Sequence, residues 1–320
     1  GVAWSAGNGV TYTGFKGSDT AADLTGTLVY GGNSQGATNV GNYNLVPSGQ
    51  SSANYATTYV NGNLGITRAP LGIVANSGSK IYGSTLAFTG SKFSSTGLKN
   101  AETIGSVNLT SLGASAIATV ADSPYDIIAS AATGGTFNPA NYTISYVDGS
   151  LGLTAAELGV TATAAIKVYD GLAWSGGNGV TYTGFQGTDT AATLTGTLVY
   201  GGNAQGATYA GTYNIVPSGQ TSTNYTITYV NGSLGITRAP LGIAADSSSK
   251  TYGSTPVFVG DEFTSTGLKN AETIGSVSLT STGTAANAGV AGGPYAIVAS
   301  GASGGTFNPA NYTIDYVDGS

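Results

Sequence analysis

The segment NYTITYVNGSLGIT, at Asn224–Thr237, decides the fold that we expect for this chain. It follows the pattern N-Y-x-x-x-Y-V-[ND]-G-x-L-G-[IL]-T, which also stands at Asn54–Thr67 and at Asn141–Thr154. The first part of the pattern returns once more at Asn311–Ser320. Because a segment that recurs at long intervals marks one position in a repeated unit, we interpret the chain as an array of small modules, each closed by this segment.

The residues of this segment predict two β-strands. Tyr225, Ile227 and Tyr229 alternate with polar residues, and a period of two indicates a strand that is buried on one face. Asn-Gly or Asp-Gly follows in every copy, and these pairs are typical of tight turns between antiparallel strands. The sequence therefore predicts a β-hairpin whose second strand carries Leu234 and Ile236.

On a larger scale the chain contains two copies of one long unit. Gly1–Ser150 aligns without gaps with Gly171–Ser320, most aligned positions are identical, and Leu151–Asp170 occurs only once. Division of both copies after the recurring segment predicts four modules, which alternate in type: 1–67, 68–154, 155–237 and 238–320.

The two outer modules differ from the inner ones. The first has no counterpart of Leu158–Asp170, and the fourth has no counterpart of the closing L-G-[IL]-T. We therefore expect the first module to be truncated at its N-terminal side and the fourth at its C-terminal side, within a longer array.

The remaining sequence predicts further strands and little helix. Strands are expected at Val180–Phe185, Thr197–Gly201, Tyr213–Ser218 and Tyr295–Ser300. Single turns of helix are expected at Thr188–Leu194, at Gly97–Val107 and at its copy Gly267–Val277. The expected fold class is mainly β: four tandem small β modules, each β-grasp-like or alternatively an immunoglobulin-like sandwich.

The linkers between modules are short. Only Arg68, Ala69 and Pro70 separate Thr67 from Leu71, and proline stiffens a linker because its ring fixes one backbone dihedral. Small modules with few covalent or metal supports need neighbours for stability, so we expect them to contact one another in an extended rod.

Composition excludes several function classes. The chain has no Cys and no His, which excludes disulfides, Cys or His metal sites, and Ser–His–Asp or Cys–His catalysis. Its net charge is −6 and it has only 9 Lys and Arg residues, which argues against nucleic-acid binding. No apolar run is long enough to span a membrane, and no calcium-loop motif occurs. We therefore expect no enzyme, no cofactor and no metal.

A few residues were weighed as candidate sites. Paired carboxylates can hydrolyse glycans, but the recurring acids favour turn and surface roles; they are Asp19, Glu102 and Asp148 with their copies Asp189, Glu272 and Asp318. Trp4 and Trp174 stand beside glycine-rich loops, where an indole ring could stack on a sugar, although packing on a small core is the interpretation that we favour. The triplet Asn-x-Thr/Ser occurs at Asn108, Asn141, Asn224, Asn231 and Asn311.

The sequence also resembles two known repeat families. KVYDGLAWSGGNGVTYTGFQGTD, at Lys167–Asp189, resembles the opening of YDG-type repeats, and Ser249–Ser320, with SKTYGSTPVF, GLKNAET and NYTIDYVDGS, resembles MBG repeats of the YGX type. Both families occur as tandem arrays in very large secreted bacterial surface proteins, including haemagglutinin-like exoproteins of two-partner secretion systems. The resemblance implies an extracellular or cell-surface location and no catalytic residues.

Two functions are consistent with these observations. The first is structural: a stalk or spacer of a bacterial adhesin, or part of a biofilm matrix filament, whose partners are neighbouring repeats. The charged fraction of 8% leaves strand edges poorly guarded, so association into fibres is a further expectation. The alternative is a set of weak glycan-binding modules that act together through avidity, with Trp4 and Trp174 as the contact residues.

Overall fold

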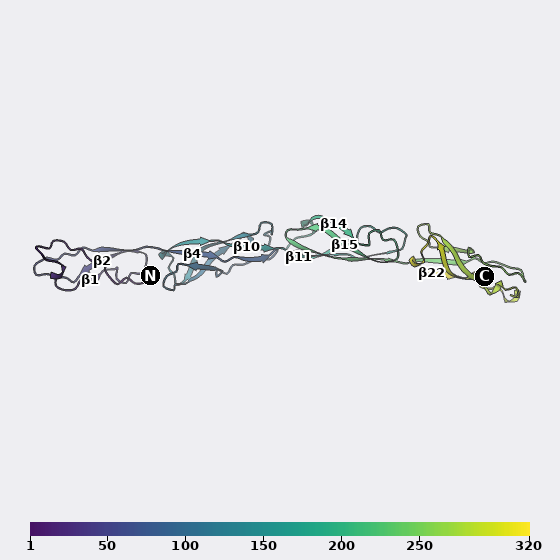
Figure 1. Cartoon of the computed structure of the whole chain (residues 1–320), viewed down its shortest axis with the longest axis horizontal. Coiled ribbons are helices and arrows are strands. Elements are labelled where there is room, and N and C mark those ends of the chain that lie inside the picture. Colours follow the sequence, from purple (N-terminus) through teal and green to yellow (C-terminus); the bar gives the residue numbers. More distant parts are fainter. The chain divides into compact units, whose positions relative to one another are not determined.

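A computed structural model describes residues 1–320, and they form two compact units, Gly1–Ala155 and Ala156–Ser320 (Figure 1). Each unit contains two of the four repeats. Strands and short 3-10 helices make up its regular structure, which confirms the predicted mainly-β fold of small modules. No helix is both long and apolar enough to cross a membrane.

The second repeat contains two mixed sheets. Their strands are β4 (Ala69–Ala75), β5 (Gly78–Ile81), β6 (Phe93–Thr96), β7 (Ile104–Thr110), β8 (Tyr125–Gly135), β9 (Tyr142–Val147) and β10 (Gly149–Thr154). The first sheet has the order β6-β4-β9 and the second has the order β5-β10-β8-β7. Strand β4 is parallel to β9, and β5 is parallel to β10. Each of the first two strands of the repeat is therefore paired in parallel with one of its last two strands.

The recurring segment does not form the predicted hairpin. Strand β9 pairs with β4 in the first sheet, whereas β10 pairs with β5 and β8 in the second, so the chain changes sheets at Asp148. Gly149 does not have a positive φ; instead, a Cβ on it would lie 2.6 Å from the carbonyl oxygen of Ala75. Gly232 approaches Ala162 in the same way. The glycine is required by the close approach of two backbones and not by a tight turn.

The predicted alternation is confirmed by burial. Leu71 and Ile73 from the first sheet share one core with Ile127 and Leu151 from the second, and all four side chains are at most 2% exposed. Burial of a side chain of this size contributes about 1.5–3 kcal/mol before entropy is counted. The core between the two sheets is therefore what orients the strands of the repeat.

One predicted turn of helix is wrong. Gly97–Val107 forms a turn followed by strand β7, and Asn100 and Ala101 both lie in the left-handed region, with φ of 52° and 54°. Asn270 and Ala271 repeat this conformation in the fourth repeat. Two successive left-handed residues reverse the chain, which a helix cannot do.

The third repeat has the same topology as the second. Its strands are β11 (Ala156–Ala162), β12 (Ala165–Val168), β13 (Val180–Thr183), β14 (Thr195–Gly201), β15 (Gly211–Thr221), β16 (Tyr225–Val230) and β17 (Gly232–Thr237). The sheets have the orders β13-β11-β16 and β12-β17-β15-β14. Thr188–Leu194, expected as a turn of helix, contains the 3-10 helix η4 (Ala191–Thr193).

The outer repeats contain fewer strands than the inner ones. The first has β1 (Val29–Gly31), β2 (Gly41–Ser48) and β3 (Gly62–Ile66); the fourth has β18 (Ala239–Ala245), β19 (Phe263–Thr266), β20 (Ile274–Thr280), β21 (Val298–Gly305) and β22 (Tyr312–Val317). In the first repeat, residues 55–60 correspond to β16 but form no strand, because no counterpart of β11 pairs with them. In the fourth, residues 248–251 correspond to β5 and have no counterpart of β10.

Short 3-10 helices connect the strands. They are η1 (Ala21–Asp23), η2 (Leu112–Ala114), η3 (Pro139–Asn141), η5 (Thr282–Thr284), η6 (Val290–Gly292) and η7 (Pro309–Asn311). In η3 the side chain of Asn138 accepts a hydrogen bond from Ala140 N, and proline occupies a first-turn position, where its missing N–H costs nothing. This cap fixes Asn141 and Tyr142 at the entrance of β9.

Candidate functional site

Each repeat contains one tyrosine whose hydroxyl donates to a carboxylate, and we call these the tyrosine–acid pairs. The tyrosine is always the second residue of the recurring N-Y segment, and the acid is one of the recurring carboxylates. The pairs are Tyr55–Asp19 at 2.7 Å, Tyr142–Glu102 at 2.6 Å, Tyr225–Asp189 at 2.6 Å and Tyr312–Glu272 at 2.5 Å. The sequence shows that both residues recur but not that they are partners.

The second repeat shows how a pair holds its turn. The hydroxyl oxygen of Tyr142 accepts a hydrogen bond from Lys99 N at 3.0 Å, while Glu102 N donates to Lys99 O at 3.0 Å. The left-handed Asn100 and Ala101 lie between these two residues. A left-handed alanine costs about 1–2 kcal/mol, so the bonds on either side stabilise a turn that is unfavourable by itself.

Electrostatics support a structural role for these pairs. Burial, and then the bond to Glu102, raises the pKa of Tyr142. Burial, and then the bond to Glu272, raises the pKa of Tyr312 to about 12. The bond to Asp19 is the largest cause that raises the pKa of Tyr55. These hydroxyls keep their protons near neutral pH and donate them in hydrogen bonds to the carboxylates. Asp148 accepts a bond from Ala129 N at 3.4 Å and is also used by the fold.

In the second unit an additional tyrosine connects the third and fourth repeats. Tyr169 follows β12, donates to Glu272 at 2.5 Å and packs its ring edge against Tyr312, with ring centroids 5.4 Å apart. Burial, and then the bond to Glu272, raises the pKa of Tyr169. Because Tyr169 belongs to the Tyr-Asp-Gly motif of the third repeat, this motif contributes a contact between repeats.

Asparagine residues at the start of β9 and β22 also join neighbouring repeats. Asn141 accepts from Val40 N at 2.9 Å and donates to Asn39 Oδ1 at 2.9 Å, and Asn311 accepts from Ala210 N at 2.9 Å. Both belong to Asn-Tyr-Thr triplets. The side-chain oxygens of both asparagines are used inside the fold, whereas the side-chain nitrogen of Asn311 is buried without a hydrogen-bond partner.

Trp4 and Trp174, the candidate ligand-binding residues, are half-buried and lie in different units. Trp174 packs against the core of the second unit, and its indole N–H donates to Gly176 O at 3.2 Å. Its backbone exchanges bonds with Ala207 O at 2.9 Å and Gly206 N at 2.8 Å. Trp4 makes the corresponding backbone bonds with Ala37 and Gly36, and its indole N–H donates to Ala6 O. Glycan binding by these residues stays a prediction.

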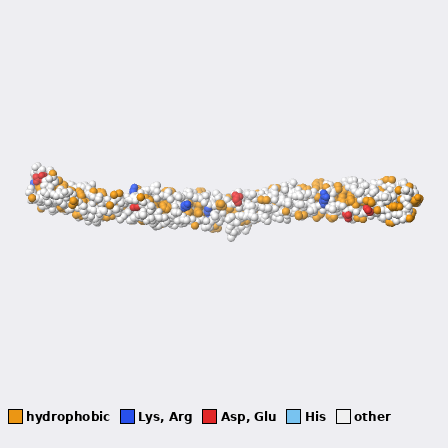
Figure 2. Space-filling view, turned by 90° about the horizontal axis from the view of Figure 1, so that it is seen from below, with side chains coloured by type: hydrophobic (Ala, Val, Ile, Leu, Met, Phe, Trp, Pro, Cys, Tyr) orange, Lys and Arg blue, Asp and Glu red, His pale blue; other side chains and the backbone are white.

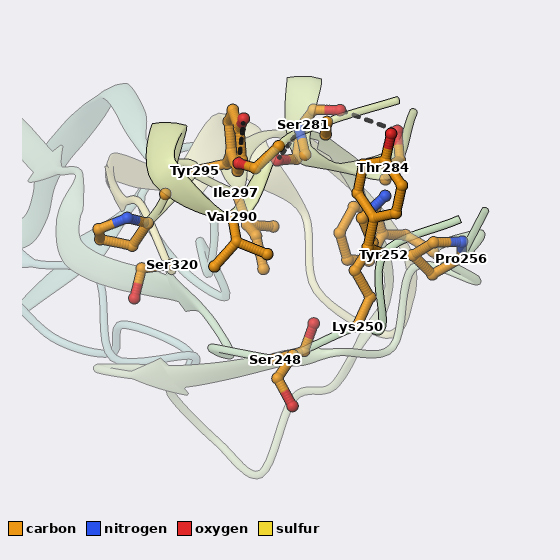
Figure 3. A pocket seen from close by; sticks show the side chains of 17 residues that line it. Ser248, Lys250, Tyr252, Pro256, Ser281, Thr284, Val290, Tyr295, Ile297 and Ser320 are labelled. Atoms are coloured by element: carbon orange, nitrogen blue, oxygen red, sulfur yellow. Dashed lines mark hydrogen bonds between the residues drawn. The ribbon is translucent and has the colours of Figure 1, made fainter. Parts of the chain in front are cut away.

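Two cavities lie in the outer repeats. The first, of about 530 Å³, lies between residues 9–15 and 55–62 of the first repeat. The second, of about 250 Å³, lies in the fourth repeat and is lined by Ser248, Lys250, Ile297 and Ser320 (Figure 3). The sequence predicts neither cavity, because each is lined by residues that are far apart in the chain.

Charged side chains do not gather into a site. Figure 2 shows isolated acidic and basic side chains on the visible face, separated by uncharged surface. No group of three or more acidic residues is placed to hold a metal ion. Lys167 and Asp170 form an ion pair at 2.7 Å, three residues apart, which belongs to the turn after β12.

Comparison with known families finds one that accounts for nearly the whole chain. Four successive segments match the MBG domain (YGX type): residues 5–65, 71–152, 158–235 and 241–320. A search of curated proteins finds no match. All four segments match the same type, in agreement with the shared topology of the second and third repeats.

Proposed function

This chain belongs to the MBG domain (YGX type) family, and on that premise we propose that it is a spacer segment of an extracellular bacterial adhesin or matrix filament. Its role is to hold distance and to bear tension, without catalysis. The finer division that we propose within the family has YDG-like first and third repeats, which carry Tyr169-Asp170-Gly171 in the third, and YGX-like second and fourth repeats.

The observation that carries this proposal is the parallel pairing of the first two strands of each complete repeat with its last two strands. In the second repeat, six residue pairs join β4 to β9 and four join β5 to β10. The chain enters at the start of β4 and leaves at the end of β10. Tension on the two ends therefore slides parallel strands past each other, and it strains all of these pairs at once.

This geometry resists extension better than an antiparallel hairpin, which opens one bond at a time. One backbone hydrogen bond contributes only about 0.5–1.5 kcal/mol net, so resistance requires that many bonds share the force. The buried side chains of Leu71, Ile73 and Leu151 must also leave the core when these strands slide. A spacer that bears tension needs this arrangement, whereas an enzyme or receptor does not.

Single-molecule force spectroscopy tests the proposal. The chain has no Cys, so cysteines added at its two ends attach it specifically. We expect two high-force unfolding events, one for each of the complete second and third repeats, each lengthening the chain by roughly 3.3–3.6 Å for every residue released. The fourth repeat lacks the β5–β10 pair and is the internal control, which should unfold at lower force. Extension of the whole chain without a high-force event would contradict the proposal.

Lateral association into fibres is a further part of the proposed role. Apolar side chains remain exposed on strands of both units, among them Val147, Ile166 and Val317, at 53%, 79% and 53%. Few charges oppose contact between such strands. Sedimentation over a range of concentrations should show association that changes little with salt. A monomer at the highest concentration would exclude this part and leave the spacer role intact.

A further inference from the structure

The third repeat meets the fourth at the turn that follows β12, residues 169–172, which we call the joint turn. Tyr169 is 3% exposed, and its N–H donates to Thr237 O at 2.8 Å, so the third repeat holds this residue by its backbone. The carboxylate of Asp170 accepts from Lys167 Nζ at 2.7 Å and from Leu172 N at 2.9 Å. Bonds within the third repeat therefore fix the shape of the joint turn.

The fourth repeat brings its left-handed turn, residues 269–272, against the joint turn. Glu272 accepts a hydroxyl from each repeat: Tyr169 donates to Oε1 and Tyr312 donates to Oε2, both at 2.5 Å. An ionised carboxylate can accept both bonds, because each of its oxygens has lone pairs to offer. The same carboxylate thus belongs to the tyrosine–acid pair of the fourth repeat and binds the third repeat.

Gly171 permits this close approach. Its φ of 75° lies in the left-handed region, and a Cβ on it would lie 2.5 Å from the Cβ of Asn270. A larger residue would push the turn of the fourth repeat away from the joint turn. The glycine therefore keeps Glu272 within reach of the Tyr169 hydroxyl.

The apolar core also continues from one repeat into the next. One cluster of buried residues contains Ala204 and Tyr169 of the third repeat together with Ala239 and Tyr312 of the fourth, and none of these four is more than 3% exposed. The rings of the two tyrosines meet edge to face, with an angle of 80° between their planes. Separation of the repeats would expose this shared core to water, which is unfavourable.

We propose that the Tyr-Asp-Gly motif of the third repeat is a coupling motif, which recognises the Lys-Asn-Ala-Glu turn of the repeat that follows it. The tyrosine binds the acid of that turn, the aspartate shapes the joint turn, and the glycine lets the two turns touch. Through these contacts the fourth repeat gains part of its stability from the third. The proposal concerns folding and does not depend on the spacer role.

Hydrogen exchange of the whole chain tests the proposal with Tyr169→Phe, which keeps the ring and removes the hydroxyl. Amides of residues 269–272 and of β22 should exchange at least about tenfold faster, because a hydrogen bond to a charged group contributes a factor of this size. Tyr182→Phe is the matched control. It removes a hydroxyl that donates to Gln220 at 2.8 Å within the third repeat, and it should leave exchange in the fourth repeat unchanged.

A second pair of variants tests the contact between the two turns. Gly171→Ala should speed exchange at residues 269–272 more in the parent chain than in a chain that carries Asn270→Gly, where the facing Cβ is absent. The backbone strain of alanine at position 171 is the same in both chains, so the difference between the two effects measures the contact.

Three results would overturn the proposal: unchanged exchange of the fourth repeat in Tyr169→Phe, an equal effect of Tyr182→Phe, or equal effects of Gly171→Ala in the two chains. If Tyr169→Phe did not fold, the comparison at Gly171 would decide. Resistance to tension rests on strand pairs within single repeats, so failure here would not bear on the spacer role.

Discussion

Replacement of Tyr142 by Phe isolates the contribution of one tyrosine–acid pair. The substitution keeps the ring, which is 4% exposed and packs near Phe137, and removes only the hydroxyl. Two interactions are lost: the 2.6 Å bond donated to Glu102 and the 3.0 Å bond accepted from Lys99 N. A hydrogen bond to a charged group contributes about 1.5–3 kcal/mol, and Lys99 N–H loses its acceptor as well. We expect Tyr142→Phe to lower the free energy of unfolding by about 2–3 kcal/mol.

Urea unfolding of the full chain measures this loss, and hydrogen exchange at Lys99–Glu102 locates it in the second repeat. Tyr55→Phe is the matched control, because it removes the same hydroxyl from a half-buried pair in the first repeat. There water can replace the lost partner, and the expected cost is below about 1 kcal/mol. Faster exchange should be confined to the repeat that carries the substitution.

A double-mutant cycle with Glu102→Gln decides whether the hydroxyl acts through the carboxylate. If it does, the two substitutions remove the same bond, and together they should cost about 1 kcal/mol or more less than the sum of the single losses. Additive losses would refute the pairing as an energetic unit. A Tyr142→Phe variant as stable as the parent chain would refute the structural role of the pair.

Three further predictions concern the same repeats. Ala101→Gly should raise the free energy of unfolding by about 1 kcal/mol, because glycine adopts the left-handed conformation at no steric cost, and Ala192→Gly in η4 should instead lower it; urea midpoints compare the two. The pKa of Tyr312 rises from 10.0 to about 12 on folding, so its stabilising contribution is complete below pH 10 and is lost between pH 10 and 12. Melting temperatures measured over this pH range should fall less in Tyr312→Phe than in the parent, and an equal fall would exclude this tyrosine as the cause. Asn141→Ala should cost about 1–3 kcal/mol in thermal unfolding by leaving Val40 N–H without its acceptor, and an unchanged melting temperature would show that the contact does not join the repeats.

The sequence predicts what depends on local pattern. Tyr225, Ile227 and Tyr229 form a strand as their alternation predicts, because burial of one face is a property of the segment itself. Tyr55 and Tyr59 have the same spacing, with Thr57 in the place of Ile227, but they form no strand. In the third repeat the corresponding strand β16 is paired with β11, so a strand requires a partner as well as a pattern.

Pairings between distant residues are beyond such patterns. Asp-Gly at Asp148 suggests a hairpin. Because β9 pairs with β4 and β10 pairs with β5, the chain instead crosses from one sheet to the other at this position. Glu102 and Tyr142 lie 40 residues apart, and nothing in either segment names the other.

Small-angle X-ray scattering of residues 1–320 in solution tests the proposed spacing role most directly. Four modules of about 30–40 Å arranged end to end predict a maximum dimension of about 120–160 Å. A globule formed from the same number of residues would have a radius of gyration of about 20 Å. A maximum dimension of about 120–160 Å supports the spacer role, and a radius of gyration of about 20 Å contradicts it.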